Sequence, residues 1–274
     1  MASVTMSTRH SNQVETTMDV ITIPSLFDNY AYLIVNDATG EAAVVDPAEA
    51  WPVLRLVQGR RLKLTAVLCT HHHQDHVGGI DELLDEFPDL RVVGFRPDRQ
   101  RIPLLNELLD DGDEFTVCGQ QCSIMQTPGH TTTSVVYRFG EHLFVGDTLF
   151  GAGCGRLFEG TAAQMADSLA KIVACGERTR LYFGHEYTMV NLRFAQQLEP
   201  GNGAIGERLQ AVAELRRTER PSSPSAVSEE LQTNPFLRVQ QKELIDTLAA
   251  RHGLTDHSPL SVFQTVRQLR NDFS

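Results

Sequence analysis

The stretch T-H-H-H-Q-D-H, residues 70–76, places four histidines and one aspartate directly after the apolar run of residues 64–69. The apolar run predicts a buried strand that ends where the polar residues begin. Five clustered polar groups cannot be buried cheaply without partners, so the string indicates a binding site. Imidazole nitrogens and carboxylate oxygens suit zinc, iron or manganese, and the lack of a thiolate disfavours a purely structural zinc site.

The spacing within this string divides the ligands between two ions. Residues i and i+2 of an extended segment face the same side, so we expect His71 and His73 to bind one ion together. His72 then points elsewhere and is expected to be structural. Asp75 and His76 follow a turn and can reach a second ion nearby.

Three later segments repeat the same local pattern, an apolar strand that ends in a ligand-type residue beside a glycine. They are Q-T-P-G-H-T with His130, F-V-G-D-T with Asp147 and Y-F-G-H-E with His185. Each of these is a weak signal alone, because a polar residue after a strand is more often part of a turn. Together with the first string they supply seven ligands, which is too many for one tetrahedral ion and fits two ions with a bridging carboxylate.

The pattern of the whole chain predicts an α+β body followed by helices. Residues 19–182 alternate short apolar runs with turn residues, and helical patterns interrupt them at 49–58, 77–86 and 161–174. After Tyr187 we expect only amphipathic helices, and these are predicted at 187–198, 204–217, 236–250 and 258–270. We therefore expect three parts, which are a disordered extension at 1–18, an α+β domain at 19–186 and a helical domain at 187–274.

Composition narrows the classes of protein and partner. The chain has 274 residues, of which 41% are hydrophobic and 22% charged, and its net charge is −11. An acidic chain is poorly suited to bind nucleic acid, and no apolar run approaches the ~18 residues of a membrane span. The five cysteines form no C-x-x-C pair, which predicts reduced thiols and a cytoplasmic protein. We expect a monomer.

At this point the sequence resembles the metallo-β-lactamase superfamily and, within it, the glyoxalase II (hydroxyacylglutathione hydrolase) family. The histidine string is specific only to the superfamily. Three segments narrow the resemblance to the family, and they are L-F-G-A-G-C-G-R-L-F-E-G-T at 149–161, G-H-E-Y-T at 184–188 and T-N-P-F-L-R-V at 233–239. The similarity extends from about residue 21 to residue 273.

The resemblance implies an αβ/βα metallo-β-lactamase sandwich with a C-terminal helical domain and a binuclear metal site. One metal would be held by His71, His73 and His130, the other by Asp75, His76 and His185, and Asp147 would bridge them. Two divalent ions are implied, with zinc expected and iron or manganese as alternatives.

The implied activity is hydrolysis of S-D-lactoylglutathione and related 2-hydroxyacyl thioesters to the acid and glutathione, the second step of methylglyoxal detoxification. A metal-bridging hydroxide would be the nucleophile, because divalent ions lower the pKa of bound water from about 15.7 to near 7. Asp75 and Asp147 would act as catalytic carboxylates through their place in the cluster.

Glutathione carries two carboxylates, so its site should hold cations. Asn234 can cap a helix with Pro235 at its first position, which would place Arg238 and Lys242 four residues apart on one face. Spacing alone also suits a solvated surface pair. The resemblance favours a role in glutathione binding for Arg238 and Lys242, and it adds Arg156 and Tyr187 as contacts. Phe158 stands where some relatives have tyrosine, which would remove one hydroxyl contact.

Other activities compete with this interpretation. Zinc β-lactamases commonly have cysteine in place of Asp147 and lack the helical C-terminal part, and a nuclease should have a basic surface. A mononuclear-iron oxidoreductase would leave the second ligand set unused. A binding module with a degenerate site disagrees with an intact set of seven ligands.

Overall fold

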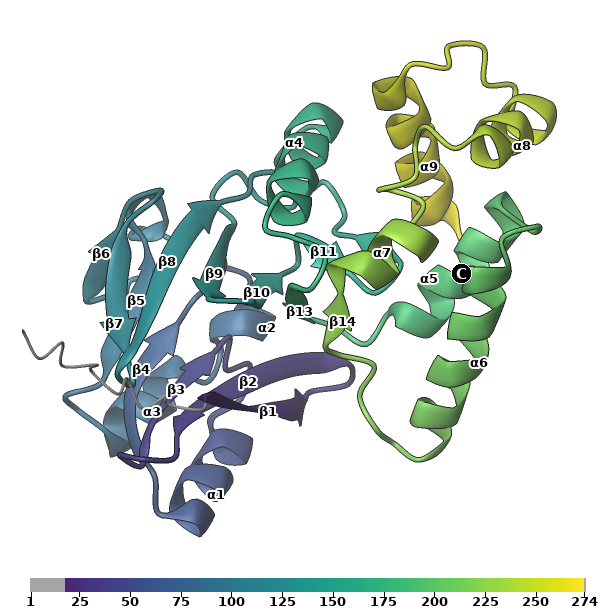
Figure 1. Ribbon diagram of the computed structural model, residues 1–274. Helices are drawn as coiled ribbons and strands as arrows, with labels where there is room; N and C mark the ends of the chain where they lie inside the picture. The colour runs from purple at the N-terminus through teal and green to yellow at the C-terminus, as the bar shows by residue number, and fades with distance from the viewer. Residues whose placement is uncertain (1–17, 274) are drawn as a thin grey trace, which may run out of the picture.

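Two six-stranded β-sheets form the centre of the molecule in the computed structural model, which describes residues 18–273 (Figure 1). The first sheet has the order β1-β2-β3-β4-β5-β6 and the second has the order β14-β13-β10-β9-β8-β7. A small hairpin, β11-β12, stands outside both. Helix α1 lies on one side of the two sheets and α4 on the other, which is the αβ/βα arrangement that the family resemblance implied.

The strands follow the apolar runs of the sequence. In the first sheet they are β1 (Met18–Ser25), β2 (Asn29–Asn36), β3 (Glu41–Val45), β4 (Lys63–Leu68), β5 (Arg91–Phe95) and β6 (Glu107–Leu109). In the second sheet they are β7 (Glu114–Val117), β8 (Gln120–Gln126), β9 (Val135–Phe139), β10 (His142–Gly146), β13 (Arg180–Phe183) and β14 (Ser225–Ala226). The hairpin consists of β11 (Leu149–Phe150) and β12 (Gly153–Cys154).

The main core lies between the two sheets, because alternate residues of facing strands point inward. Tyr32 of β2 and Leu68 of β4 belong to the same buried cluster as Tyr137 of β9 and Phe144 of β10. The other face of the first sheet is covered by α1 (Ala50–Arg60) and α3 (Ile80–Glu86), which close a second apolar cluster. Since both faces of the first sheet are covered, all eight residues of β2 are buried.

The remaining helices are mostly C-terminal, on one side of the sheets (Figure 1). Helix α2 (Gln74–Val77) and α4 (Ala162–Val173) belong to the body, and Arg96–Asp98 forms a 3-10 turn. The C-terminal helices are α5 (Thr188–Leu198), α6 (Gly203–Arg217), α7 (Val227–Thr233), α8 (Lys242–His252) and α9 (Pro259–Asp272).

Two expectations about the C-terminal part are wrong. A strand does follow Tyr187, because β14 pairs antiparallel with β13 and so joins the C-terminal part to the second sheet. The helix predicted at 236–250 begins only at Lys242, since residues 234–241 form turns. The disordered extension predicted at 1–18 lies outside the described residues except for Met18, which begins β1.

No helix within residues 18–273 is long and apolar enough to cross a membrane.

Candidate metal centre

The predicted ligands converge at one edge of the sandwich because they follow neighbouring strands. His71 comes after β4, His130 after β8, Asp147 directly after β10 and His185 two residues after β13. The two sheets meet at this edge, where the Tyr30 amide at the start of β2 donates to the Gly184 carbonyl at 2.8 Å. Both sheets therefore contribute to this edge, and a backbone hydrogen bond joins them there.

The first ligand set consists of His71, His73 and His130, whose ligand atoms all lie within 4.8 Å of one another. His73 Nδ1 is 3.1 Å from His71 Nε2 and 3.0 Å from His130 Nε2. His73 thus presents Nδ1 where the other two present Nε2. His72 points away toward Asp98 and Glu159, as predicted, at 3.7 and 3.5 Å from their carboxylates.

The second set consists of Asp75, His76 and His185, again with ligand atoms within 4.8 Å of one another. His76 Nε2 and His185 Nε2 are 3.4 Å apart, and Asp75 Oδ2 is 3.4 Å from His185 Nε2. Asp75 and His76 reach this place because helix α2 begins directly after His73 and turns the chain back.

Asp147 lies between the two sets. Its Oδ1 is 3.3 Å from His76 Nε2, and its Oδ2 is 3.4 Å from both His130 Nε2 and His185 Nε2. Oδ1 is buried without a hydrogen-bond partner. A buried carboxylate oxygen without a partner, with several imidazole nitrogens converging around it, is the environment that divalent cations satisfy. The residues present therefore fit a metal centre.

In three of the ligand histidines, His71, His76 and His185, a side chain contacts the ring nitrogen that faces away from the metal centre. His76 Nδ1 donates to Asp46 Oδ2 and His185 Nδ1 to Asp28 Oδ1, both at 2.9 Å. Thr70 Oγ1 donates to Asp46 at 2.6 Å and lies 3.0 Å from His71 Nδ1. Such contacts select the tautomer and orient the ring toward a metal.

Backbone and amide groups hold two further ligands. His130 Nδ1 donates to the Arg156 carbonyl at 2.8 Å. Asn29 Nδ2 donates to Asp75 Oδ2 at 3.1 Å and to the Asp75 carbonyl at 2.9 Å. The sequence interpretation missed Asp28, Asn29 and Asp46. Asp46 follows the strand A-A-V-V but stands beside a proline and not a glycine, so only part of the strand-end pattern was present.

Without bound cations, the carboxylates at the centre retain protons on two histidines. Burial lowers the pKa of His76, but Asp147 and Asp46 outweigh burial and raise it to about 10. Burial likewise lowers the pKa of His185, while Asp147 and Asp75 raise it to about 12. Burial raises the pKa of Asp147, yet His185 and His76 hold it well below its usual range. The centre thus keeps its carboxylates ionised, which favours the binding of cations.

A cavity of about 280 Å³ opens beside the centre, bordered by His130 and Asp147. Three arginines line it, Arg156 from the body and Arg267 and Arg270 from α9. Burial, Arg267 and Arg156 all lower the pKa of Arg270, which shows how closely the positive charges are gathered. An anionic ligand would relieve this repulsion, so the cavity is suited to carboxylates despite the acidic composition of the chain.

The walls of this cavity are well fixed. Arg267 is 7% exposed, and its Nη1 donates to the Cys154 carbonyl at 2.6 Å, while its buried Nε has no partner. Arg270 Nε donates to Asn191 Oδ1 at 2.8 Å. The Tyr187 ring stacks on the ligand His185 with centroids 4.8 Å apart and an interplanar angle of 3°. Arg156 and Tyr187, which the sequence analysis named, line this cavity, and so do Arg267 and Arg270, which it did not name.

The C-terminal helices also hold the loop that follows Asp147. Asn191 Nδ2 donates to the Gly151 carbonyl at 3.0 Å, and the Ala152 amide donates to Glu230 Oε2 at 2.8 Å. Asn234 Nδ2 donates to the Gly153 carbonyl at 3.0 Å. The segment that carries Arg156 is therefore shaped by side chains from α5 and α7.

The predicted helix with Asn234 as its N-cap is wrong. Asn234 follows the end of α7, and its buried amide is used by the loop at residues 150–153. Arg238 instead pairs with the buried Glu199 at 2.8 Å, and Lys242, with 87% of its side chain exposed, pairs with Asp246. Neither Arg238 nor Lys242 is among the residues that line the cavity.

Comparison with known proteins identifies the family. Residues 25–185 match the metallo-β-lactamase superfamily, and residues 186–273 match the C-terminus of hydroxyacylglutathione hydrolase. The chain is 44% identical to the hydroxyacylglutathione hydrolase of Chromohalobacter salexigens over 259 residues, covering 93% of this chain and 100% of the relative. The chain belongs to the hydroxyacylglutathione hydrolase family of the metallo-β-lactamase superfamily.

Other similarities agree with this placement. The hydroxyacylglutathione hydrolase of Vibrio cholerae is 40% identical over 256 residues, covering 93% of this chain and 100% of that protein. Among solved structures, ETHE1 from Myxococcus xanthus aligns with a TM-score of 0.60 and 26% identity, over 94% of this chain and 100% of that one. The BLEG-1 B3 metallo-β-lactamase aligns with a TM-score of 0.62 and 24% identity, over 80% and 99%, and shows the shared fold. Family and ligand clusters together support divalent metal binding.

Proposed function

We propose that this hydroxyacylglutathione hydrolase family member hydrolyses S-D-lactoylglutathione and related 2-hydroxyacyl thioesters to the free acid and glutathione, the second step of methylglyoxal detoxification. The observation that carries the proposal is the juxtaposition of a metal centre and an arginine-lined cavity that share His130 and Asp147 as a border. A thioester bound with its carrier in the cavity has its carbonyl at the centre.

The centre is suited to hold two divalent ions, and zinc is the metal we propose. His71, His73 and His130 would hold one ion, Asp75, His76 and His185 the other, and Asp147 would touch both. When bound, such ions supply the Lewis acidity that makes water acidic at neutral pH and polarises a carbonyl. The departing thiolate is a good leaving group, since an ordinary thiol has a pKa of about 8.5, so no dedicated acid is required.

The side chains around the centre act by holding charge and geometry. Asp46 and Asp28 keep His76 and His185 in the tautomer that leaves Nε2 free. Asp147 and Asp75 lower the net positive charge of the loaded centre and fix the spacing of the two sets. In this proposal both are catalytic carboxylates because they adjoin the reacting atoms.

The arginines would bind the carboxylates of glutathione. Arg267 and Arg270 are the cations of α9 that line the cavity, and Arg156 faces them from the loop after β12. Charge-assisted hydrogen bonds from guanidinium groups to carboxylates are among the stronger polar contacts in proteins. Tyr187 would form another wall of the carrier site. The sequence-based assignment of Arg238 and Lys242 to this role remains a prediction.

The metal ligands and the α9 arginines lie in different parts of the chain, which suggests two domains with different roles. We infer a catalytic domain at residues 19–186 and a substrate-binding domain at 187–274. We further propose a cytoplasmic monomer that uses neither nucleic acid nor a membrane as a partner.

Loss of thioester absorbance on incubation of zinc-loaded protein with S-D-lactoylglutathione tests the proposal. Rapid turnover is expected. As a matched control, the same acyl group on N-acetylcysteamine retains the thioester but lacks both carboxylates, and we expect slow hydrolysis with a higher KM. Absence of turnover on S-D-lactoylglutathione in metal-loaded protein would contradict the assignment.

A further inference from the structure

The segment G-H-E-Y-T at 184–188 contains a carboxylate that neither the metal centre nor the cavity uses. Glu186 stands between the ligand His185 and the cavity wall Tyr187, but it belongs neither to a ligand set nor to the cavity lining. Its side chain is only 10% exposed. Burial of a carboxylate is costly unless hydrogen bonds compensate for the lost water. The contacts of Glu186 therefore indicate what this residue does.

Donors from three separate segments converge on the Glu186 carboxylate. Oε2 accepts from Tyr30 Oη of β2 and, at 2.9 Å, from the Ser222 amide. Oε1 accepts from Ser222 Oγ at 2.7 Å. Arg216 of α6 adds an ion pair, with its Nε 3.6 Å from Oε2. The carboxylate thus joins the first sheet to α6 and to the connection between α6 and β14.

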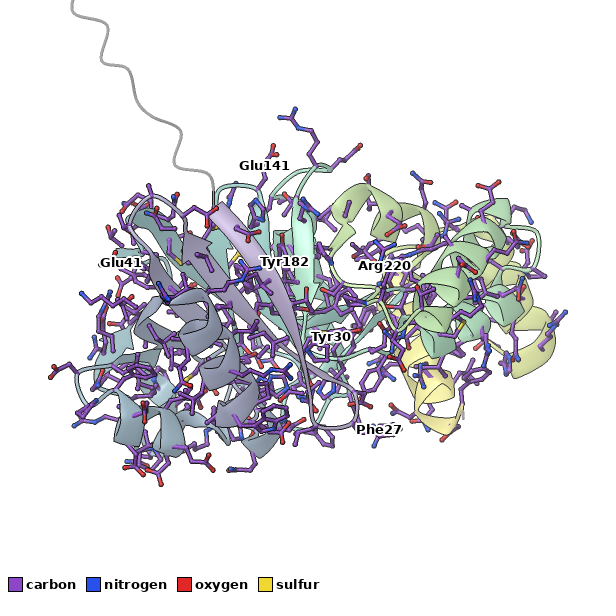
Figure 2. All side chains as sticks on the ribbon, turned by 90° about the horizontal axis from the view of Figure 1, so that it is seen from below. Phe27, Tyr30, Glu41, Glu141, Tyr182 and Arg220 are labelled. Carbon is purple, nitrogen blue, oxygen red and sulfur yellow. The ribbon has the colours of Figure 1, made fainter. Side chains whose placement is uncertain are left out.

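These contacts lie where the sandwich meets the C-terminal helices, and Figure 2 shows Tyr30 and Arg220 at this junction. Arg216 Nη1 donates to the Arg220 carbonyl at 2.7 Å, which holds the start of the connection. The connection is held again at Ser223, whose Oγ lies 2.6 Å from Tyr32 Oη. The C-terminal part is therefore tied to β2 on both sides of the residue that contacts the carboxylate.

The backbone at Glu186 links these contacts to the metal centre. The Glu186 amide donates to the Asp28 carbonyl at 2.8 Å, and Asp28 Oδ1 accepts from His185 Nδ1 at 2.9 Å. The Tyr187 ring, on the other side, stacks on the His185 ring with centroids 4.8 Å apart. A shift of Glu186 would therefore move a ligand of the second set and a wall of the cavity together.

We propose that Glu186 is a positioning residue through which the C-terminal helices set the orientation of His185 and Tyr187. Its hydrogen bonds hold the segment 185–187 from outside, and it touches neither the ion nor the substrate. Loss of the carboxylate leaves Tyr30 Oη and the Ser222 amide without their acceptor, and the segment loses its fixed place. The consequence for KM rests on the proposed function, whereas the consequence for metal affinity does not.

Zinc affinity of metal-stripped protein, measured by competition with a chelator, tests the proposal without substrate. We expect Glu186→Ala to weaken one of the two zinc equivalents by about 10-fold, because ligand orientation contributes to affinity. Glu186→Gln keeps the shape and an acceptor for the Ser222 amide, so its affinity should stay within about 3-fold of the wild type. KM for S-D-lactoylglutathione should follow the same order. The value of kcat at full zinc loading should change less than about 2-fold, because Tyr187 adjoins a part of the substrate that does not react.

Two buried tyrosines of one aromatic cluster provide a matched control. Both rings pack near Tyr32, with centroids 6.3 Å away for Tyr30 and 5.3 Å away for Tyr182. Tyr30→Phe removes one donor to Glu186 and should weaken the same zinc equivalent by about 3-fold. The Tyr182 hydroxyl instead contacts His142 at the start of β10, the end of that strand away from the metal ligands. Tyr182→Phe should leave zinc affinity and KM unchanged. Each variant loses one hydroxyl contact, so thermal scans should show similar small losses of stability.

The outcomes separate positioning from general stability. Unchanged zinc affinity in Glu186→Ala, or equal weakening of both equivalents, would overturn the proposal. An equal effect of Tyr30→Phe and Tyr182→Phe on zinc affinity would overturn it as well, and this pair decides if Glu186→Ala does not fold. If the zinc-loaded wild type does not hydrolyse S-D-lactoylglutathione but Glu186→Ala still weakens one equivalent selectively, the proposed function is wrong and the positioning of His185 stands.

Discussion

The metal edge and the arginine cavity adjoin each other, yet they are built in opposite ways. At the metal edge the side chains come from strand ends of one α/β body, and their positions follow from the sheet. In the cavity, Arg267 and Arg270 come from the last helix and meet the loop after Asp147 from outside the sandwich. In the proposed function, the chemistry therefore depends on the sheet, whereas recognition of the glutathione carrier depends on how the helices pack onto the sheet.

This contrast predicts that substitutions on the two sides alter different kinetic constants. A change at the metal edge should lower kcat or metal content, because it acts on the reacting atoms. A change in the cavity should raise KM, because it acts on a part of the substrate that does not react.

The largest effect is expected at the metal edge itself. His73→Ala removes the nitrogen that His71 and His130 both face, and with it one ion. Loss of several kcal/mol of transition-state stabilisation corresponds to a fall in kcat of about 1000-fold or more. Turnover and metal content measured on the same sample check this. His72→Ala is the matched control and should retain normal turnover. Normal turnover in His73→Ala would contradict the role of His73 as a metal ligand.

Metal affinity should depend steeply on pH. In the ion-free centre the pKa values of His76 and His185 are raised to about 10 and about 12, so both rings carry protons at neutral pH. Because metal must displace these protons, affinity falls as pH falls below the pKa values. With two protons released, apparent affinity should change by up to about 100-fold per pH unit between pH 6 and 8. Calorimetry in buffers of different ionisation enthalpy counts the protons, and a count of zero would contradict the prediction.

Substitution of a residue that hydrogen-bonds to a ligand histidine should have a smaller effect than loss of the ligand itself. Asp46→Asn keeps the shape of the side chain but weakens the contacts to His76 and Thr70. We expect metal affinity to fall about 10- to 100-fold, with KM little changed in fully loaded protein. Competition with a chelator measures the affinity. A raised KM at full loading would show that the two regions are not separable in this way.

In the cavity, Arg270→Gln should raise KM for S-D-lactoylglutathione by about 10-fold, the value of one charge-assisted hydrogen bond, and leave kcat and metal content near normal. Lys242→Gln tests whether Lys242 contributes to glutathione binding. The sequence-based assignment predicts a raised KM for it, whereas its pairing with Asp246 at an exposed position predicts no change. Steady-state kinetics of the two variants decides between these expectations.

The sequence was most informative where geometry is local. A strand that ends in a ligand can be read from neighbouring residues, so the structure brings all seven predicted ligands together at one edge. The pattern A-A-V-V-D also contained Asp46, but an aspartate after a strand is more often part of a turn. Asp28 and Asn29 had only a turn signal, because their role depends on pairing with residues far along the chain.

The residues that line the cavity could not be predicted from neighbouring residues in the sequence. Arg267 contacts Cys154, which is 113 residues away in the sequence, and only the packing of α9 decides which face of that helix meets the loop. Charged residues on an amphipathic helix ordinarily face solvent. The same limitation explains Arg238, since Asn234 and Pro235 are typical of a helix start but here follow a helix end. The partner of Arg238, Glu199, is set by tertiary packing.

Titration of metal-stripped protein with zinc tests whether two ions occupy the edge at which the seven ligands meet. Bound zinc and the rate of S-D-lactoylglutathione hydrolysis would be followed together. We expect binding to saturate at two equivalents per chain and activity to reach its maximum only there. Full activity and saturation at one equivalent would contradict this expectation.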